Sequence, residues 1–382
     1  MYTVLNVATL TKFHSYFSGL LLTLMIEWVL FVFFPFISFI CMKKIIAGWL
    51  FVFFVLCAGY FLVRYEAISL AKDSEYSPQI PLGIEGELWV SPYGIEDKLI
   101  NRMLASKYSM QMWFYRISRD QAEQVMKNLS RVWVDIAWIG ENKPYEWIDK
   151  AFLKTAKRMQ NAGITVTDDK HLWLNFNHAK VIIADKKRFL LATANLTYSS
   201  IRRNREYRFT SDHEWVTQSL VSLFEDDLKW KKTDIDSLDP NLILCPENCR
   251  TLITKMIDES KKSLDISVQY LQDKIIRDLL ISKAKEIDLR ILVWFWQNEW
   301  RLNEFPEWVV KILPDPYLHT KNILIDDSLL IHGSMNMSEN SLDNNREIGI
   351  IISDDSAIRS FSRQFSKDRE EGVLFKERNF SD

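Results

Sequence analysis

Two short stretches of the chain carry histidine and lysine at the same spacing. His178 and Lys180 stand two residues apart, and so do His319 and Lys321. On a β-strand, residues i and i+2 point to the same face, so each pair projects into one pocket. Imidazole titrates near neutral pH and lysine supplies positive charge. The pairs therefore predict chemistry on a negatively charged group, with the histidines as nucleophile and general acid–base.

The two stretches belong to a repeat whose shift of 141 residues runs from His178 to His319. The same shift aligns further polar residues, which points to a duplicated unit. The aligned pairs are Lys180 with Lys321, Asp185 with Asp326, Asn195 with Asn336, Ser200 with Ser341, and Asn204-Arg205-Glu206 with Asn345-Arg346-Glu347. The duplication predicts one composite site that takes one histidine from each copy.

Apolar runs alternate with helical patterns in both copies, which is typical of α/β units. We predict two repeated α/β/α units whose mixed, mostly parallel sheets pack together. The first copy has expected strands at 87–91, 110–115 and 132–138 and helices at 96–107 and 120–129; the second has strands at 242–245, 264–268 and 289–296 and helices at 250–262 and 273–286. Each histidine motif then predicts a hairpin, with strands at 180–184 and 189–192 and at 321–325 and 329–332.

The first seventy residues differ from the rest, so we predict a membrane anchor over 1–75. Its apolar runs, 19–41 and 45–63, include one long enough to span a bilayer. The remaining chain divides by prediction into a first repeat at 85–230, a polar linker at 231–241 and a second repeat at 242–382.

Two interpretations of the anchor stay open. One is a hairpin of two transmembrane helices; the other is a signal-like sequence that starts at Met42-Lys43-Lys44. The positive-inside rule places Lys43 and Lys44 in the cytoplasm in both cases. We therefore expect an extracytoplasmic catalytic domain, where Cys245 and Cys249 have a spacing that permits a disulfide.

The polar residues around the histidines suit a phosphodiester, whose negative charge repels nucleophiles and must be neutralised. Lys180 and Lys321 provide charge, Asn195 and Asn336 provide N–H donors, and Ser334 and Thr193 provide hydroxyls. Glu206 and Glu347 are candidates for holding the far nitrogen of each ring, and Asp185 and Asp326, at turns, for support. We expect no metal, because no Asp, Glu, His or Cys cluster offers a site, and we expect no cofactor.

These residues resemble the phospholipase D superfamily, whose motif is H-x-K-x4-D-x6-G-S-x-N. The second copy matches from His319 to Asn336; the first departs only where Ala192 and Thr193 replace Gly and Ser. The resemblance covers roughly residue 85 to the C-terminus and is nearest to bacterial cardiolipin synthase-like proteins. It implies a two-step reaction through a phosphohistidine, with His178 as nucleophile and His319 as acid–base.

The substrate stays open between two classes. The anchor, the aromatic residues near the motifs and a net charge of −2 favour a phospholipid at a membrane, cleaved or transferred at its head group. The alternative is a membrane-tethered nuclease acting on DNA or RNA. Arg202, Arg203 and Arg205 follow the first motif and favour it weakly, as residues that steer an anionic substrate.

Overall fold

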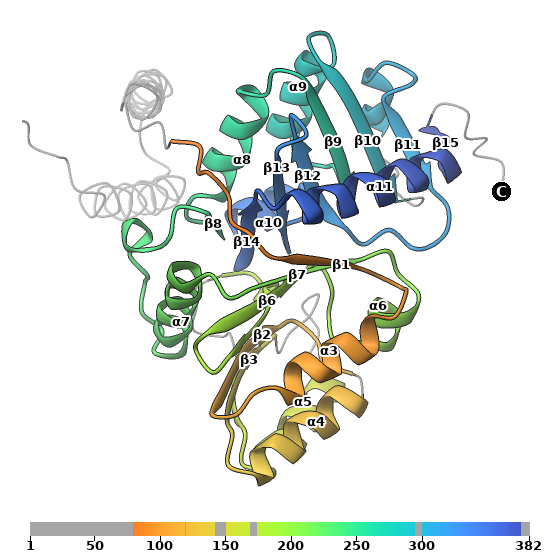
Figure 1. Cartoon of the computed structure of the whole chain (residues 1–382). Helices are drawn as coiled ribbons and strands as arrows, with labels where there is room; N and C mark the ends of the chain where they lie inside the picture. The colour runs from red at the N-terminus through yellow and green to blue at the C-terminus, as the bar shows by residue number, and fades with distance from the viewer. Residues whose placement is uncertain (1–78, 119, 142–149, 169–173, 295–299, 376–382) are drawn as a thin grey trace, which may run out of the picture. The chain divides into compact units, whose positions relative to one another are not determined.

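The computed structural model describes residues 79–118, 120–141, 150–168, 174–294 and 300–375 (Figure 1). The predicted anchor and its two apolar runs lie outside these residues. Among the helices of the described ranges, none is long and apolar enough to cross a membrane. The described residues fall within one unit of the chain, Pro78–Asp382.

The first copy of the repeat builds a seven-stranded sheet in the order β1-β7-β6-β5-β2-β3-β4. Its strands are β1 (Glu87–Val90), β2 (Ser109–Phe114), β3 (Asp135–Gly140), β4 (Thr165–Asp168), β5 (Lys180–Ala184), β6 (Arg188–Ala192) and β7 (Tyr207–Ser211). Its helices are α3 (Ile95–Leu104), α4 (Asp120–Arg131), α5 (Lys150–Gln160), α6 (Tyr198–Arg202) and α7 (Glu214–Leu228). Figure 1 shows α3, α4 and α5 grouped on one side of this sheet.

The second copy builds an eight-stranded sheet in the order β15-β11-β10-β9-β12-β13-β14-β8. Its strands are β8 (Leu242–Cys245), β9 (Ser263–Val268), β10 (Asp288–Trp294), β11 (Val310–Leu313), β12 (Lys321–Ile325), β13 (Leu329–Gly333), β14 (Glu347–Ile352) and β15 (Val373–Leu374). Its helices are α8 (Cys249–Asp258), α9 (Lys274–Lys283), α10 (Glu339–Asp343) and α11 (Asp355–Glu371), with short 3-10 turns η2 (Ile235–Ser237) and η3 (Trp300–Glu304).

The prediction of an α/β fold with two mixed sheets is confirmed, but the prediction that they are mostly parallel is wrong. In the described chain only β2-β3-β4 and β9-β10-β11 pair in parallel. The other named strands pair antiparallel, including the motif hairpins β5-β6 and β12-β13. Parallel pairing needs a crossover helix, whereas a tight turn reverses the chain. The helical patterns in the sequence indicated these crossovers. Most of the antiparallel pairs, such as β1-β7 and β9-β12, join strands that no tight turn connects, so no local pattern indicated them.

Apolar residues of both copies meet in one shared core between the two sheets. That core includes Trp113 and Val181 of the first sheet and Leu324 and Ile350 of the second, each at most 1% exposed. Two further cores fill the outer faces, one under α3 to α5 and one under α8 and α9. Strands buried on both faces read as continuous apolar runs, which is how they appear in the sequence. The shared core holds the two copies together as one body.

The aspartate of each motif anchors the hairpin turn. Asp185 and Asp326 adopt left-handed φ values of 55° and 51°, a conformation that Asp tolerates better than most residues. The Asp185 carboxylate accepts the N–H groups of residues 107 to 109, and the Asp326 carboxylate accepts those of residues 261 to 263. Each aspartate thus ties its hairpin to the start of the neighbouring strand.

The C-x3-C pair forms a disulfide. Cys245 ends β8 and Cys249 begins α8, and their sulfurs are 2.09 Å apart. Cys245 also pairs across the sheet with Glu347, the first residue of β14. The disulfide that the spacing permits is therefore present, one strand away from a predicted site residue.

Candidate active site

Each motif histidine is held by a glutamate of the other copy. His178 Nδ1 lies 2.9 Å from Glu347 Oε2, and His319 Nδ1 lies 2.9 Å from Glu206 Oε2. Both glutamate side chains are fully buried, whereas the histidine side chains keep 15% and 14% of their surface exposed. The two motifs, far apart in the sequence, are thereby joined in one site at the interface of the copies.

Donors from its own copy surround each buried glutamate. Thr193 Oγ1 donates to Glu206 Oε2 over 2.6 Å, and the Ser341 hydroxyl donates to Glu347 Oε1. The asparagine of each Asn-Arg-Glu tripeptide donates to the same glutamate, over 3.3 and 3.2 Å. Burial by itself raises the pKa of a carboxyl group, but the facing histidine, a lysine and a hydroxyl group (that of Thr193 for Glu206 and of Ser334 for Glu347) hold the pKa of both glutamates below the ordinary value. Both glutamates are therefore ionised.

The ionised glutamates determine the tautomer of both rings. A carboxylate only accepts hydrogen bonds, so we assign the proton of each neutral ring to Nδ1, which leaves a free lone pair on Nε2. Burial lowers the pKa of His178, and it lowers the pKa of His319 to about 4 despite the opposing effect of Glu206. The positive charges of Lys180 and Lys321 lower both pKa values further. Each ring is therefore neutral at pH 7.

Two lysines lie fully buried beside the histidines. Lys180 Nζ donates to the main-chain carbonyl of His178 over 2.6 Å, and Lys321 Nζ donates to that of His319 over 3.1 Å. Lys321 Nζ also donates to Gln269 Oε1 over 3.2 Å. Burial lowers the pKa of Lys180 to about 8 and that of Lys321 to about 7, although the two glutamates raise both. An anion bound between these ammonium groups would restore their full charge.

The motif asparagines offer amide groups to the site. Asn195 and Asn336 each follow the return strand by three residues, at the end of the sheet where the lysines lie. Among the described residues, the Oδ1 atom of each is buried without a hydrogen-bond partner. Buried polar atoms normally have hydrogen-bond partners. A side-chain amide can offer a ligand either its oxygen as an acceptor or its NH₂ group as a donor. Both side chains are therefore available to a ligand.

The hydroxyls at the ends of the return strands hold the main chain together. Ser334 Oγ accepts the N–H of Ile348 over 3.1 Å, which fixes β13 to β14. Thr193 Oγ1 accepts the N–H of Tyr207 over 3.0 Å in the same place of the first copy. The Thr that replaces Ser in the first motif thus keeps the hydrogen bond.

The other departure from the motif is also accommodated. In the second copy, a Cβ on Gly333 would come within 2.7 Å of the Cα of Gly349, its partner across the sheet. In the first copy the corresponding pair is Ala192 with Arg208. Close approach of two backbones therefore requires glycine only in the second copy.

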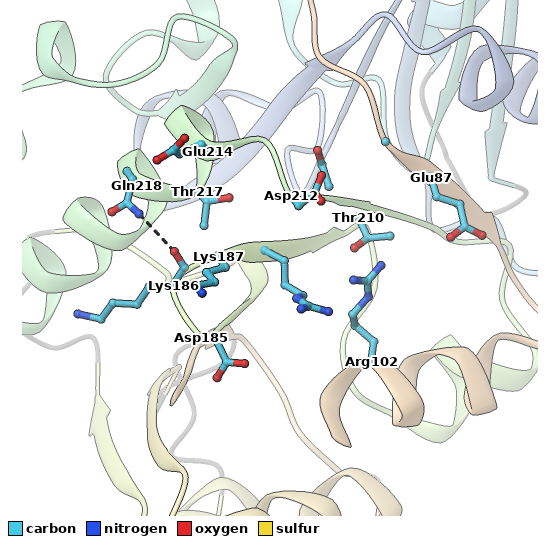
Figure 2. Close-up of a pocket in the computed structure, with 13 residues that line it drawn as sticks. Glu87, Arg102, Asp185, Lys186, Lys187, Thr210, Asp212, Glu214, Thr217 and Gln218 are labelled. Carbon is cyan, nitrogen blue, oxygen red and sulfur yellow. Dashed lines mark hydrogen bonds between the residues drawn. The ribbon is translucent and has the colours of Figure 1, made fainter. Parts of the chain in front are cut away.

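Asp185 and Asp326 lie at the far end of their hairpins from the histidines. Asp185 follows Lys180 by five residues, a distance of roughly 16 Å along β5. Figure 2 shows Asp185 lining a pocket together with Lys186, Lys187 and residues of β7 and α7; His178 and His319 do not line this pocket. The aspartates support the hairpin, and they do not reach the reacting groups.

Three residues beside the histidines were not predicted from the sequence. The Tyr115 ring meets the His178 ring edge-on, with centroids 5.3 Å apart, and Tyr317 stacks on His319 at 5.8 Å. Gln269 Nε2 donates to Tyr317 Oη over 2.5 Å. Tyr115 and Gln269 directly follow the parallel strands β2 and β9, and the carboxyl ends of such strands commonly border a ligand site. Their position after these strands is the feature of the sequence that could have identified Tyr115 and Gln269 as site residues.

Arg205, one of three arginines that the sequence offered weakly for steering an anionic substrate, is buried instead. Its side chain is 1% exposed, and Nε and Nη2 both donate to Asp368, over 2.8 and 3.0 Å. Because the guanidinium group is buried and already paired with a carboxylate, it is not exposed to an incoming anion. Within the described ranges, no group of three or more His, Cys, Asp and Glu residues is arranged to hold a metal ion.

The model of the family "Cardiolipin synthase, PLD-like domain" matches residues 99–228 and 253–369. The chain belongs to this family. It is 24% identical to the probable cardiolipin synthase YwiE of Bacillus subtilis over 56% of its own length and 51% of that protein. It is 21% identical to the minor cardiolipin synthase ClsB of the same species over 85% of its own length and 88% of that protein. The chain thus spans about half the length of the first of these curated relatives.

A solved phosphatidylserine synthase of Haemophilus influenzae shares the fold, with a TM-score of 0.59 and 10% identity over 77% of this chain and 89% of that one. The recognition of a phospholipase D-type chain, nearest in appearance to cardiolipin synthases, is therefore confirmed. Each matched segment covers most of the strands of one sheet, so the family unit occurs twice.

The lysine environment predicts that anion binding weakens as pH rises. Sulfate keeps its charge over the range tested, so only the protein titrates. Because the pKa of Lys321 is about 7 and that of Lys180 about 8, sulfate should bind about tenfold to a hundredfold more weakly at pH 9 than at pH 6. Isothermal titration calorimetry measures the affinity for sulfate at each pH. Lys321→Arg, whose charge does not titrate, should flatten the profile; a wild-type affinity independent of pH would contradict the assignment.

Proposed function

We propose that this protein is a phosphatidyl transferase that works through a phosphohistidine and acts on phospholipid head groups. The observation that supports it most is the crossed pair of His–Glu hydrogen bonds, which leaves Nε2 of both rings free beside two buried lysines. A free imidazole nitrogen is a nucleophile, and buried ammonium groups stabilise the charge of a phosphoryl group in transit.

In the first step, His178 Nε2 attacks phosphorus. The P–Nε2 bond forms, the bond from phosphorus to the leaving alcohol oxygen breaks, and His319 gives that oxygen a proton from its own Nε2. The anionic substrate offsets the lysine charges that lower the pKa of His319, so binding favours the protonated acid form. Lys180, Lys321, Asn195 and Asn336 contact the non-bridging oxygens.

In the second step, His319 Nε2 accepts the proton of an incoming hydroxyl group. The oxygen of that group attacks phosphorus, the P–Nε2 bond breaks, and His178 returns to its neutral form. With a lipid alcohol as acceptor the product is a new phosphodiester, and with water it is a phosphatidic acid. Glu206 and Glu347 keep the Nδ1–H of the two rings hydrogen-bonded through both steps, so only Nε2 exchanges protons or phosphorus.

A phospholipid is the substrate we favour. The matching family model and both curated relatives carry the name cardiolipin synthase, and the net charge of −2 supplies no broad basic field for nucleic acid. If phosphatidylglycerol serves as both donor and acceptor, the new phosphodiester is cardiolipin and the leaving alcohol is glycerol. Cleavage of DNA or RNA is the competing outcome.

We propose further that the apolar runs at 19–41 and 45–63 anchor the enzyme in the membrane where its substrate lies. Lys43 and Lys44 place the second run with its start in the cytoplasm, so the catalytic domain faces the other side. A reporter that is active only outside the cytoplasm, fused after Asp382, should be active. Activity of a cytoplasmic reporter at the same position would reverse the orientation.

The substrate prediction is tested with the full-length chain in detergent micelles. Fluorescent phosphatidylglycerol should give cardiolipin or phosphatidic acid, at a rate unchanged by EDTA, and labelled single-stranded DNA should stay intact. His178→Ala should lower the rate about 10⁴-fold or more, the size typical of losing a catalytic nucleophile. Thin-layer chromatography and gel electrophoresis measure the two products.

The control is Asp326→Asn, at the far turn of the second hairpin. It removes charge from an acceptor of three backbone N–H groups, so it should cost about 1–3 kcal/mol of unfolding free energy while the folded enzyme keeps its turnover. Cleavage of DNA alone would refute the lipid substrate. Turnover that survives both His178→Ala and His319→Ala, or that needs a divalent ion, would refute the histidine mechanism.

A further inference from the structure

A second set of interactions between the two copies, made by arginine and aspartate, lies next to the His–Glu pairs. Arg205 of the first copy bonds Asp368 in α11 of the second, with Nε and Nη2 at 2.8 and 3.0 Å from its oxygens. Arg346 of the second copy bonds Asp227 in α7 of the first, with Nη2 at 3.0 Å. Asp227 and Asp368 are separated by the same shift of 141 residues as the motifs. The four side chains are at most 5% exposed.

The main chain of each arginine touches the histidine of the opposite copy. The His319 N–H donates to the Arg205 carbonyl over 3.1 Å, and the His178 N–H donates to the Arg346 carbonyl over 2.9 Å. The next residue in each case is the glutamate that holds the ring of the same histidine. A shift of either arginine would therefore move both supports of one histidine, at its main chain and at Nδ1.

We propose that Asp368 and Asp227 are positioning residues, each of which aligns one histidine through the Asn-Arg-Glu tripeptide of the other copy. Asp368 acts on His319 through Arg205 and Glu206, and Asp227 acts on His178 through Arg346 and Glu347. Each of these Asp–Arg pairs, together with its tripeptide, forms a clamp on one histidine, and the two clamps share no residue. With a leaving group that needs no proton, the clamp on His178 affects formation of the phosphohistidine, and the clamp on His319 affects its breakdown. This inference rests on the proposed phosphohistidine mechanism.

The two clamps differ in strength. In its clamp Arg205 bonds one carboxylate, that of Asp368, and its Nη1 donates to the main-chain carbonyl of Ser91. Arg346 is shared between Asp227 and Glu247, whose oxygens lie 3.0 Å from its nitrogens. Losing one partner of a buried pair leaves an uncompensated charge unless a second carboxylate remains. Asp368→Asn should therefore have the larger effect of the two substitutions.

The test uses the full-length chain and phosphatidyl-p-nitrophenol, whose leaving group departs without protonation. Release of p-nitrophenol in the first turnover then reports formation of the phosphohistidine, and the steady-state rate reports its breakdown. With His178 as nucleophile, Asp368→Asn should keep the burst and slow breakdown about tenfold or more. Asp227→Asn should slow the burst itself, by a smaller factor. Mass spectrometry of the quenched enzyme identifies which histidine carries the phosphoryl group.

Asp265→Asn is the matched control. Asp265 is also buried in a pair with an arginine, Arg290, at 2.6 Å, but this pair lies within the second copy and contacts neither tripeptide. It should lower thermal stability and leave both kinetic phases unchanged. If Asp368→Asn does not fold, Arg205→Lys replaces it, because lysine keeps the charge and loses the two-point contact.

The outcomes separate the two proposals. A wild-type enzyme without a burst and without phosphohistidine would refute the proposed function. A wild-type burst, with Asp368→Asn and Asp227→Asn slowing the same step or behaving like Asp265→Asn, would overturn the positioning role alone. If His319 carries the phosphoryl group, the effects of the two variants should exchange.

Discussion

The structure depends on one buried interaction made twice, an ionised glutamate that accepts the Nδ1 proton of a histidine from the other copy. A carboxylate inside a protein is costly unless hydrogen bonds and opposite charge compensate it. Here a hydroxyl, an amide and the ring supply the bonds, and the nearby lysines supply the charge. In return the glutamate sets the tautomer, orients the ring and joins the two copies. Neither copy holds a complete site, because each lacks the glutamate for its own histidine.

The duplication could be predicted from the sequence because polar residues recur at one shift. It identified the histidines, lysines, asparagines and glutamates that the structure brings together. The pairing of each glutamate with the histidine of the other copy could not be predicted. A repeat shows that Glu206 and Glu347 are equivalent, but it does not show which histidine each one faces. That choice is made by the shared core, which packs β6 and β5 of one sheet against β13 and β14 of the other. Arg205, which the sequence offered weakly for steering a substrate, is buried at the same interface in a pair with Asp368.

Strand direction and substrate choice could not be predicted from the sequence, each for a different reason. Period and composition identify strands such as β12, but they do not distinguish a short antiparallel return from a crossover until the pairing is known. Substrate choice depends on the residues that border the reacting groups. Tyr115, Gln269 and Tyr317 break the symmetry there, with an aromatic ring beside Lys180 and an amide beside Lys321. The reaction type follows from what the copies share, and selectivity is expected to follow from what they do not.

The crossed assignment is tested most directly by ¹⁵N NMR of the histidine rings. In the wild-type protein, His178 and His319 should both show protonated Nδ1 and unprotonated Nε2 at neutral pH. Glu347→Gln should change the ring signals of His178 and leave those of His319 near their wild-type positions, and Glu206→Gln should do the reverse. If Glu206→Gln perturbs His178 instead, each glutamate serves its own copy, and the composite site described above is wrong.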